Sequence, residues 1–553
     1  MKRFIGFTFL ALFLNTMGLP CLAVTPDSDS VDSNPPAGIF TNDGLIVDSV
    51  EICNRNIYDA KDGDYDHFIF KIANKLHIKT RKSIVERELL LKKGDTYSQA
   101  LAEETARNIR QKLIVYDAWS EVETLPDGRL LWRVVTVDQW SFNGGVNYGR
   151  EGNETRWQIG FDEKNFLGYN QFVSFYYYNQ SDDDNYIEGS IADRRFWGKR
   201  LRIQLDYSSN PFRETAGFTL QRPYYDLEQT TYFSLISRTL SGRRDIYSDN
   251  LKVAESRYDG EATEFLAAYR LGKYREKLRF QFSYDYRNER TVDRTFLTGD
   301  PDDIALAISS FPNDTLYHQF GLATAYSNFD YAKMHRVDGF GYTEDYLLGY
   351  FGEGQFSRAF NAAFDDHRYD RADLFLARYF GFRSGLLLVD YEHSLWYRAT
   401  HNFRRVAALS VRFYQQPSSY FTIALRSAYI SAWNSEDRED ILLGGTTGIR
   451  GYDKYFKTGN RKALVNVEGR FYSGVKFLSA LFGAVVFADW GSIWKTNEAI
   501  TLDNSYASAG VGLRVAFEKS TKNIVRIDVA YSEQTSWQLS IGTDQYFRAQ
   551  SFD

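Results

Sequence analysis

Most of this chain alternates between apolar and polar side chains with a period of two residues. Residues 201–207 alternate at every position, and residues 278–284 do the same. In residues 525–531, the apolar side chains fall on one face, and Arg526 and Asp528 fall on the other. A period of two is that of a β-strand with one apolar and one polar face. The pattern runs from about Gln139 to Phe547 and predicts a large, mainly β structure.

The side chains on the two faces indicate where the apolar face points. The polar faces carry many Arg, Asp, Glu and Gln residues, and aromatic residues gather at strand ends, as at Tyr176, Tyr177, Tyr178 and Trp490. This is typical of a transmembrane antiparallel β-barrel, whose apolar face meets lipid between aromatic girdles. A secreted sandwich or solenoid is the alternative, but no internal repeat is visible. Counting gives up to 20 strands, the last of them ending at Tyr546 and Phe547.

The N-terminus predicts export. Lys2 and Arg3 precede an apolar run over residues 4–14, and Ala23 is a small residue at a plausible cleavage point. We therefore expect a signal peptide over residues 1–23, followed by a flexible leader over 24–43 that is rich in Pro, Ser and Asp. No later apolar run reaches about 18 residues, so we expect no transmembrane helix. Any crossing of a membrane must then use closed strands.

Residues 44–138 have a different pattern from the rest and predict one small α+β domain. Residues 47–53 alternate as a strand, and residues 84–91 predict a helix that ends before Gly94. Ser98 can cap a second helix, and residues 116–124 and 129–137 predict a hairpin. The expected order is β-α-α-β-β. The barrel is expected to fill residues 139–553.

The densest group of glycines lies in residues 443–452, inside a connection (434–462) that is too long for a simple hairpin. Further on, strand parity turns Phe487, Asp489 and Gly491 inward and Trp490 outward. A carboxylate on a barrel's inner wall needs water or a cationic partner. An arginine at the tip of a loop that folds inward can supply two parallel hydrogen bonds to it.

Four motifs in the last third occur in the order that a known family uses. They are Leu-Gly-Gly at 443–445 with Ile-Arg-Gly-Tyr at 449–452, Asn-Val-Glu-Gly-Arg at 466–470, Phe-Ala-Asp-Trp-Gly at 487–491, and Ser-Ala-Gly-Val-Gly-Leu-Arg at 508–514. Together they resemble the BamA/TamA and two-partner-secretion superfamily of outer-membrane proteins. Residues 74–77 and 94–97 of the N-terminal domain resemble that superfamily's POTRA domain.

The resemblance implies a site inside the barrel. The loop residues Gly448, Ile449, Arg450, Gly451 and Tyr452 are expected to enter the lumen. Arg450 is expected to pair with Asp489 on a wall that also holds Phe487 and Gly491. Glu468 and Arg470 are expected as further charges of the lumen wall. The family also implies 16 strands, where the count from alternation gives up to 20.

The resemblance also implies a function. Such a protein lies in the outer membrane of Gram-negative bacteria, with its POTRA domain in the periplasm, and inserts or exports client polypeptides without ATP. Its partners are outer-membrane lipid and those clients. The alternative is a passive, porin-like channel in which the loop plugs the lumen; a barrel enzyme is a distant third.

The sequence contains little that points to other chemistry. There is no Gly-x-Ser-x-Gly elbow, no organised Ser/His/Asp set and no nucleotide-binding motif, so we expect no enzyme. A net charge of −6 gives no reason to expect nucleic acid. The seven His form no cluster at metal-ligand spacing. No metal or other cofactor is expected.

Overall fold

The structure is a computed structural model, and it describes residues 42–59, 65–125, 128–151, 154–180, 183–248, 251–310, 314–360, 369–398, 401–433, 441–445, 447–453, 456–495, 498–519 and 522–549. The predicted signal peptide lies outside the described residues, as does the expected leader up to residue 41. No helix among the described residues is both long enough and apolar enough to cross a membrane.

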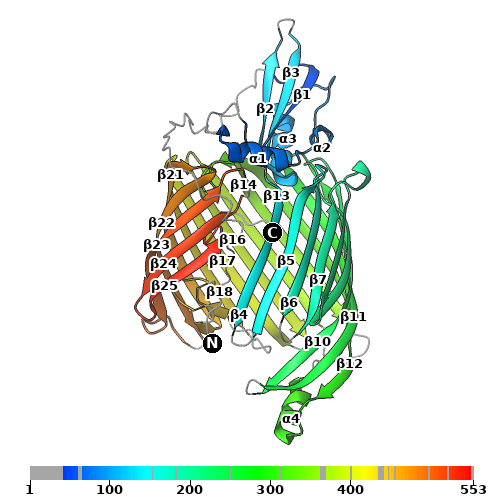
Figure 1. The fold of residues 1–553 in the computed structure, drawn as a ribbon, viewed down its shortest axis with the longest axis vertical. Helices are drawn as coiled ribbons and strands as arrows, with labels where there is room; N and C mark the ends of the chain where they lie inside the picture. Colours follow the sequence, from blue (N-terminus) through cyan, green and yellow to red (C-terminus); the bar gives the residue numbers. More distant parts are fainter. Residues whose placement is uncertain are drawn as a thin grey trace.

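Twenty strands form a closed antiparallel barrel (Figure 1). The first eleven are β4 (Phe142–Glu151), β5 (Glu154–Phe166), β6 (Gln171–Gln180), β7 (Asp183–Asp193), β8 (Arg202–Asn210), β9 (Arg213–Arg222), β10 (Thr231–Ser248), β11 (Leu251–Leu271), β12 (Glu276–Phe296), β13 (Thr315–Met334) and β14 (Glu344–Phe360). The other nine are β15 (Tyr369–Phe382), β16 (Gly385–Arg398), β17 (His401–Ser418), β18 (Phe421–Trp433), β21 (Arg461–Phe477), β22 (Ala480–Trp494), β23 (Ser505–Phe517), β24 (Ile524–Ser532) and β25 (Ser536–Thr543). The predicted mainly β, antiparallel barrel is confirmed, and its strand number is the upper count; the 16 strands implied by the resemblance are wrong for this chain.

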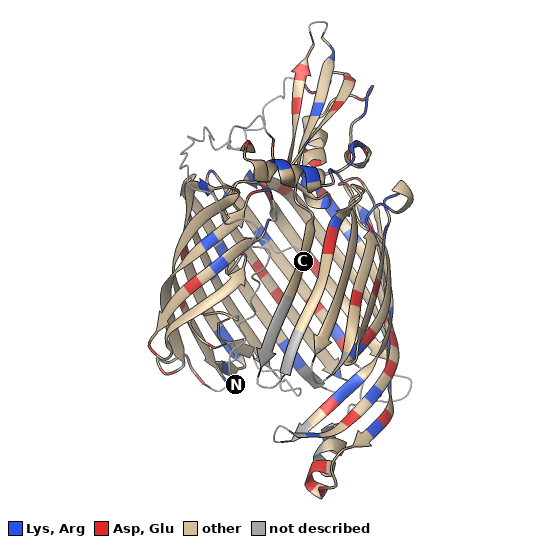
Figure 2. Cartoon of the chain, in the orientation of Figure 1, with Lys and Arg blue, Asp and Glu red and all other residues tan. Residues whose placement is uncertain are grey.

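The period of two in the sequence becomes an outer apolar face and an inner polar face. Phe280 and Phe282 of β12 point outward and are substantially exposed. Arg279, which directly precedes Phe280 in the chain and so lies on the other face, forms an ion pair at 2.5 Å with Glu353 of β14. Figure 2 shows charged residues recurring along the strands that line the barrel. Because side chains alternate across a strand, one register sets both surfaces at once.

A small module over residues 42–138 lies at one mouth of the barrel, here called the module end (Figure 1). Its elements are β1 (Val47–Arg55), α1 (Phe68–Leu76), α2 (Lys82–Glu86), α3 (Gln99–Lys112), β2 (Val115–Thr124) and β3 (Leu130–Asp138). The sheet order is β1-β3-β2, with β1 parallel and β2 antiparallel to β3. Val47, Ile109 and Trp132 are buried in the core between the sheet and α3.

The helices of the module differ from those expected. The helix expected over residues 84–91 is the short α2, and α1 is a helix beyond the two expected. Phe68, Ile72 and Leu76 recur every fourth residue in α1, a helical spacing that was available in the sequence.

Side chains of the module contact a barrel turn directly. Arg110 of α3 donates two hydrogen bonds to Asp345 of β14, at 2.8 and 2.6 Å, and this pair is almost fully buried. Thr343, in the turn before β14, donates to Asp117 of β2 through both its backbone N–H and its hydroxyl. The module is thereby fixed to the β13–β14 turn.

The barrel's opposite mouth, the far end, carries a lobe built from three long strands. β10, β11 and β12 extend beyond their neighbours there, and helix α4 (Pro301–Ser310) packs on them through Ala307, which contacts Ala254 (Figure 1). The connection from β12 to β13 therefore contains a helix among its described residues.

Candidate functional site

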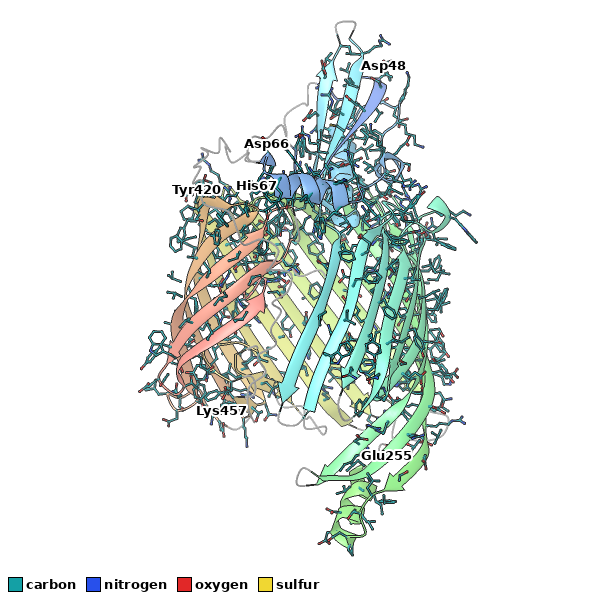
Figure 3. All side chains as sticks on the ribbon, in the orientation of Figure 1. Asp48, Asp66, His67, Glu255, Tyr420 and Lys457 are labelled. Carbon is teal, nitrogen blue, oxygen red and sulfur yellow. The ribbon has the colours of Figure 1, made fainter. Side chains whose placement is uncertain are left out.

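The glycine-rich loop enters from the far end of the barrel. Two short strands, β19 (Ile441–Leu443) and β20 (Lys457–Gly459), pair with each other at its base. Figure 3 places Lys457 at the far end, opposite Asp48 and His67 of the module. Lys462 of β21 donates hydrogen bonds of 2.9 Å to the carbonyls of Leu442 and Thr447 and so holds the loop against the wall.

Arg450 is almost completely buried and donates hydrogen bonds to two carboxylates. Its Nε and Nη2 donate to the two oxygens of Asp489, at 2.8 and 2.9 Å, and its backbone N–H donates to the same carboxylate at 3.0 Å. Its Nη1 donates to Oε1 of Glu468 at 2.5 Å. The structure therefore brings Arg450 and Asp489 together in a bidentate pair and adds Glu468 as a second acceptor.

Neighbouring strands position the acceptors by register. Asn466 of β21 lies opposite Asp489 of β22, and Glu468 lies opposite Phe487. The Asn466 amide donates both to Asp489 Oδ1, at 2.9 Å, and to the carbonyl of Gly448, at 2.8 Å. The Phe487 ring lies 3.6 Å from the Arg450 guanidinium carbon, in a cation–π contact. The inward parity expected for Phe487 and Asp489 is the parity observed.

Gly451 allows the loop to reach the wall. Its φ is +82°, and a Cβ placed on it would lie 3.0 Å from the Cβ of Ala530 on β24. The left-handed conformation and the close approach both favour glycine. Gly491 is comparable on the other side of the contact, because a Cβ there would lie 3.0 Å from the side chains of Ile449 and Leu443.

The remaining loop residues of the predicted site are buried against the wall. Ile449 is fully buried and packs with Leu443 and Tyr452. The Tyr452 hydroxyl donates to the carbonyl of Ala507, at 3.0 Å, and is 2.7 Å from Gln534 Oε1. All five predicted loop residues thus pack against the wall formed by β21–β24 or against other residues of the loop.

A second insertion comes from the module end and was not foreseen from the sequence. The β13–β14 turn (335–343) folds inward, so that Val337 is fully buried. Arg470, expected only as a wall charge, donates from Nη1 to Asp338 Oδ1 at 2.9 Å and to the Val337 carbonyl at 2.7 Å. Its Nε donates to Glu468 Oε2 at 2.8 Å. Glu468 therefore bridges Arg450 of the far-end loop and Arg470, which holds the module-end turn.

The C-terminal tail is the third insertion and corrects an expectation. Tyr546 and Phe547 do not end the last strand: β25 ends at Thr543, and Asp544 has a φ of +65°. Beyond that bend the chain enters the lumen, where Phe547 is 6% exposed.

The tail contacts both other insertions. The Phe547 carbonyl accepts from Arg470 Nη2 at 2.7 Å, and the backbone N–H of Ala549 donates to Asp338 Oδ2 at 2.7 Å. On the loop side, the Tyr546 hydroxyl donates to the Gly445 carbonyl at 3.1 Å, and its ring lies 4.3 Å from the Arg450 guanidinium carbon. No periodicity in the sequence signals contacts of this kind.

The charges of this cluster are matched in sign. The buried Arg450, Arg470 and Arg514 contact the buried Glu468, Asp489 and Asp528, and Asp338 adds a further carboxylate. Burial raises the pKa of the Asp338 carboxyl, against the opposing effect of Arg470. Among the described residues no group of His, Cys, Asp and Glu could hold a metal ion. The arrangement is suited to holding three chain segments together inside a barrel.

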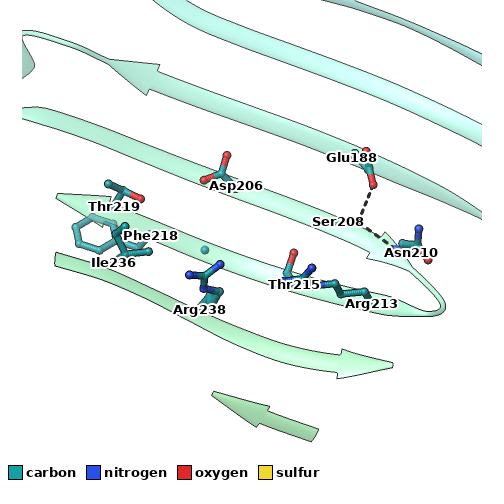
Figure 4. A pocket seen from close by; sticks show the side chains of 11 residues that line it. Glu188, Asp206, Ser208, Asn210, Arg213, Thr215, Phe218, Thr219, Ile236 and Arg238 are labelled. Atoms are coloured by element: carbon teal, nitrogen blue, oxygen red, sulfur yellow. Dashed lines mark hydrogen bonds between the residues drawn. The ribbon is translucent and has the colours of Figure 1, made fainter. Parts of the chain in front are cut away.

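The wall across β7–β10 differs from the wall that the loop covers. A hollow of about 380 Å³ lies against these strands, lined by inward-facing polar residues that include Glu188, Asp206 and Arg238 (Figure 4). Ser208 donates to Glu188 there, at 3.2 Å.

Comparison with known proteins gives weak likenesses. No protein-family model and no curated protein sequence matches the chain. Similar solved structures include BamA from Haemophilus ducreyi lacking POTRA domains 1–3 (10% identity, 90% of this chain and 84% of that chain, TM-score 0.35). CdiB from Acinetobacter baumannii is also similar, with 10% identity over 90% of this chain and 74% of that chain and a TM-score of 0.37. CdiB from Escherichia coli has 9% identity over 94% of this chain and 92% of that chain, with a TM-score of 0.41. Because every TM-score is below 0.5, we take no function or residue role from these proteins.

Proposed function

We propose that this protein is an outer-membrane barrel that inserts or exports client polypeptides without ATP, with a POTRA-type module that receives them in the periplasm. In this proposal the module end lies in the periplasm, and the far end, with its lobe, lies outside the cell. Arg450, held by Asp489 and Glu468, keeps the loop inside the lumen.

The two surfaces of the barrel support the membrane location. Large apolar side chains such as Leu205, Leu322 and Leu376 are exposed on the outer face, whereas charged pairs lie on the inner face. In water such a surface would be a large aggregation-prone patch. In lipid it is the expected outer face of a barrel, and the predicted signal peptide supplies the route to it.

One observation carries the proposal of a polypeptide client, and it lies at the boundary between β25 and β4. These two strands are neighbours where the ring closes. They are hydrogen-bonded neighbours, and they join the last strand of the barrel to the first. β25 is also short, with eight residues, and its Trp537, Leu539 and Ile541 are strongly exposed. A short closing strand contributes few hydrogen bonds to this boundary, and its separation from β4 would free backbone groups to pair with an incoming strand.

The module supports the same proposal. Its sheet has β3 in the centre, so β1 and β2 are the edge strands, and either edge offers backbone groups for β-augmentation. The direct contacts of Arg110 and Asp117 with the β13–β14 turn connect the module to the insertions that fill the lumen beside β21–β24.

A passive channel is the second candidate, and the polar hollow along β7–β10 favours it. That wall carries Glu188, Asp206 and Arg238 and lies apart from the strands that the loop covers. A diffusion pore needs such a polar lining, but it has no use for a module with open sheet edges.

Depletion of the protein followed by proteomics of the outer membrane distinguishes the two. We expect the loss of several barrel proteins if the clients are inserted, or of one exoprotein if a single client is exported, with recovery when the wild-type chain is restored. An unchanged outer-membrane proteome, together with impaired uptake of small solutes, would overturn the proposal in favour of the channel.

A further inference from the structure

Helix α1 of the module has an apolar face that the rest of the molecule leaves uncovered. Phe68, Ile72 and Leu76 are 61%, 51% and 68% exposed. Their spacing of four residues places them on one side of the nine-residue helix. Exposed apolar residues on the barrel's outer face are expected, but these three belong to the module.

The opposite side of α1 is fixed to the barrel. Phe70 is 3% exposed and packs against Tyr58 and Tyr65 in a cluster that also contacts Trp140 and Leu478. The Tyr65 hydroxyl donates to Glu518, in the β23–β24 turn, at 2.5 Å. The helix therefore cannot rotate its apolar side inward without breaking these contacts.

The helix lies along the rim of the barrel. Just before it, Tyr65 contacts the β23–β24 turn; just after it, Arg81 contacts the β5–β6 turn, with its N–H donating to the Gly168 carbonyl at 3.1 Å. α1 thus spans the module end of the β25–β4 boundary. Figure 1 shows it lying across the top of the barrel, roughly perpendicular to the long axis of the molecule. A helix that follows this direction runs parallel to the surface of a membrane around the barrel.

Other exposed apolar residues lie in barrel turns at the module end. Leu167 of the β5–β6 turn is 49% exposed, and Trp197 of the β7–β8 turn is 81% exposed. Lys75 on α1 and Lys79 just after it are exposed as well. Apolar side chains flanked by lysines at the edge of an apolar belt match the boundary between acyl chains and phosphate headgroups.

We propose that α1 is an interfacial anchor that binds the phospholipids of the periplasmic leaflet. Phe68, Ile72 and Leu76 enter the upper acyl region, and Lys75 and Lys79 contact the anionic headgroups. This rests on the proposed outer-membrane location of the barrel. A client polypeptide is the competing occupant, but a client strand pairs through the backbone at a sheet edge, whereas the backbone groups of a helix interior are already used. The anchor would hold the module at a fixed height beside the boundary where we propose that clients leave.

The test uses the full mature chain in vesicles of phosphatidylethanolamine and phosphatidylglycerol, with Cys53→Ser as the background. A bimane label is attached at Ile72→Cys, and quenching by lipids brominated near the headgroup end of their acyl chains is measured. Glu121→Cys, on an exposed position of β2, is the aqueous control. Leu205→Cys, on the outer face of β8, is the control within the barrel's apolar belt.

We expect the label at residue 72 to be quenched several-fold more than the label at residue 121. If residue 205 is quenched and residue 72 behaves like residue 121, the anchor is overturned while the barrel location stands. If residue 205 is not quenched, the barrel location itself fails. If residue 72 becomes shielded only when an unfolded polypeptide is added, the occupant is a client and the lipid proposal is wrong.

A second variant ties the effect to the apolar side of the helix. Replacing both Phe68 and Leu76 with Ser, with the label kept at residue 72, is expected to lower its quenching towards that of residue 121. Unchanged quenching in this variant would contradict the assignment.

Discussion

Arg450 has more acceptors than a single ion pair supplies. Asp489 accepts from its side chain and from its backbone, and Glu468 accepts from the remaining guanidinium nitrogen. A buried charge is tolerated when its donors are satisfied in this way, and removing one partner of a buried pair costs about 3–5 kcal/mol. The position of the loop therefore depends strongly on this one side chain.

Replacing Arg450 with Ala, or Asp489 with Asn, is expected to leave the barrel in the outer membrane while abolishing client handling. Heat-modifiable migration on gels reports folding, and export or insertion of clients reports function. Arg371→Ala is a matched control, because Arg371 pairs with Asp373 at 2.9 Å on β15, away from the loop. Normal client handling by a correctly folded double variant would contradict a functional role for the pair.

At Gly451 both the backbone conformation and the packing against the wall favour a glycine. Gly451→Ala places a side chain at a φ of +82° and against Ala530. The left-handed conformation alone costs a non-glycine residue about 1–2 kcal/mol. We expect faster proteolysis within the loop. Gly354→Ala on β14 is the control, since a Cβ there meets nothing within 4 Å. Equal proteolysis of the two variants would show that the loop tolerates the change.

At the scale of elements, strand alternation allowed the barrel and its two faces to be predicted. Parity correctly placed Asp489 and Phe487 inward because a strand's side chains alternate regardless of tertiary context. The pairing of Arg450 with Asp489 came from the family resemblance and could not follow from periodicity. The contacts of Arg470 with Asp338 and with the tail join segments far apart in the chain, and such pairings have no local signature.

The tail shows why strand ends are hard to predict. Tyr546 and Phe547 are aromatic residues close after an alternating run, which is also how a girdle at the end of a strand looks. The positive φ of Asp544 turns the chain inward before they are reached. Asp is among the residues that adopt this conformation most readily, but a single Asp predicts no bend.

Removing residues 545–553 is expected to loosen the lumen without dismantling the barrel. β25 remains intact, whereas Arg470 loses the Phe547 carbonyl and Arg514 loses Gln545, whose side-chain oxygen accepts from its Nε at 3.0 Å. More frequent open events in planar-bilayer conductance would report the change. A shorter truncation that removes only residues 550–553 keeps these contacts and is the control. Identical conductance of the two truncations would contradict a role for the tail in closing the lumen.

At the scale of the whole molecule, one series of contacts connects the module to the far-end loop. It passes from Asp117 through the β13–β14 turn to Arg470, Glu468 and Arg450. A second connection runs from Tyr65 to Glu518 at the rim, where Lys476 also contacts Glu518 at 2.7 Å. Because these contacts are continuous, displacement of the module and displacement of the loop are expected to be coupled.

The rim contact predicts a dependence on pH. Burial raises the pKa of Glu518, but Lys476 and the Tyr65 hydroxyl outweigh it and lower the pKa below its usual value. The stabilisation of docking is therefore fully present above the ordinary glutamate pKa of about 4.3 and is lost as the pH falls through the lowered value. Spin-label distances between module and barrel should broaden under acid. Glu518→Gln should already be broadened at neutral pH and change little with acid; a wild-type distribution unaffected by acid would contradict the contact's role.

The central claim is that a client leaves through the boundary between β25 and β4. In-cell photocrosslinking tests it most directly, with a photoreactive amino acid at Leu539 of β25 and, as control, at Phe282 of β12, both exposed on the outer face. The account predicts crosslinks to client polypeptides from residue 539 and not from residue 282. Crosslinks to clients that are equally frequent at both positions, or absent at residue 539 while export proceeds, would contradict it.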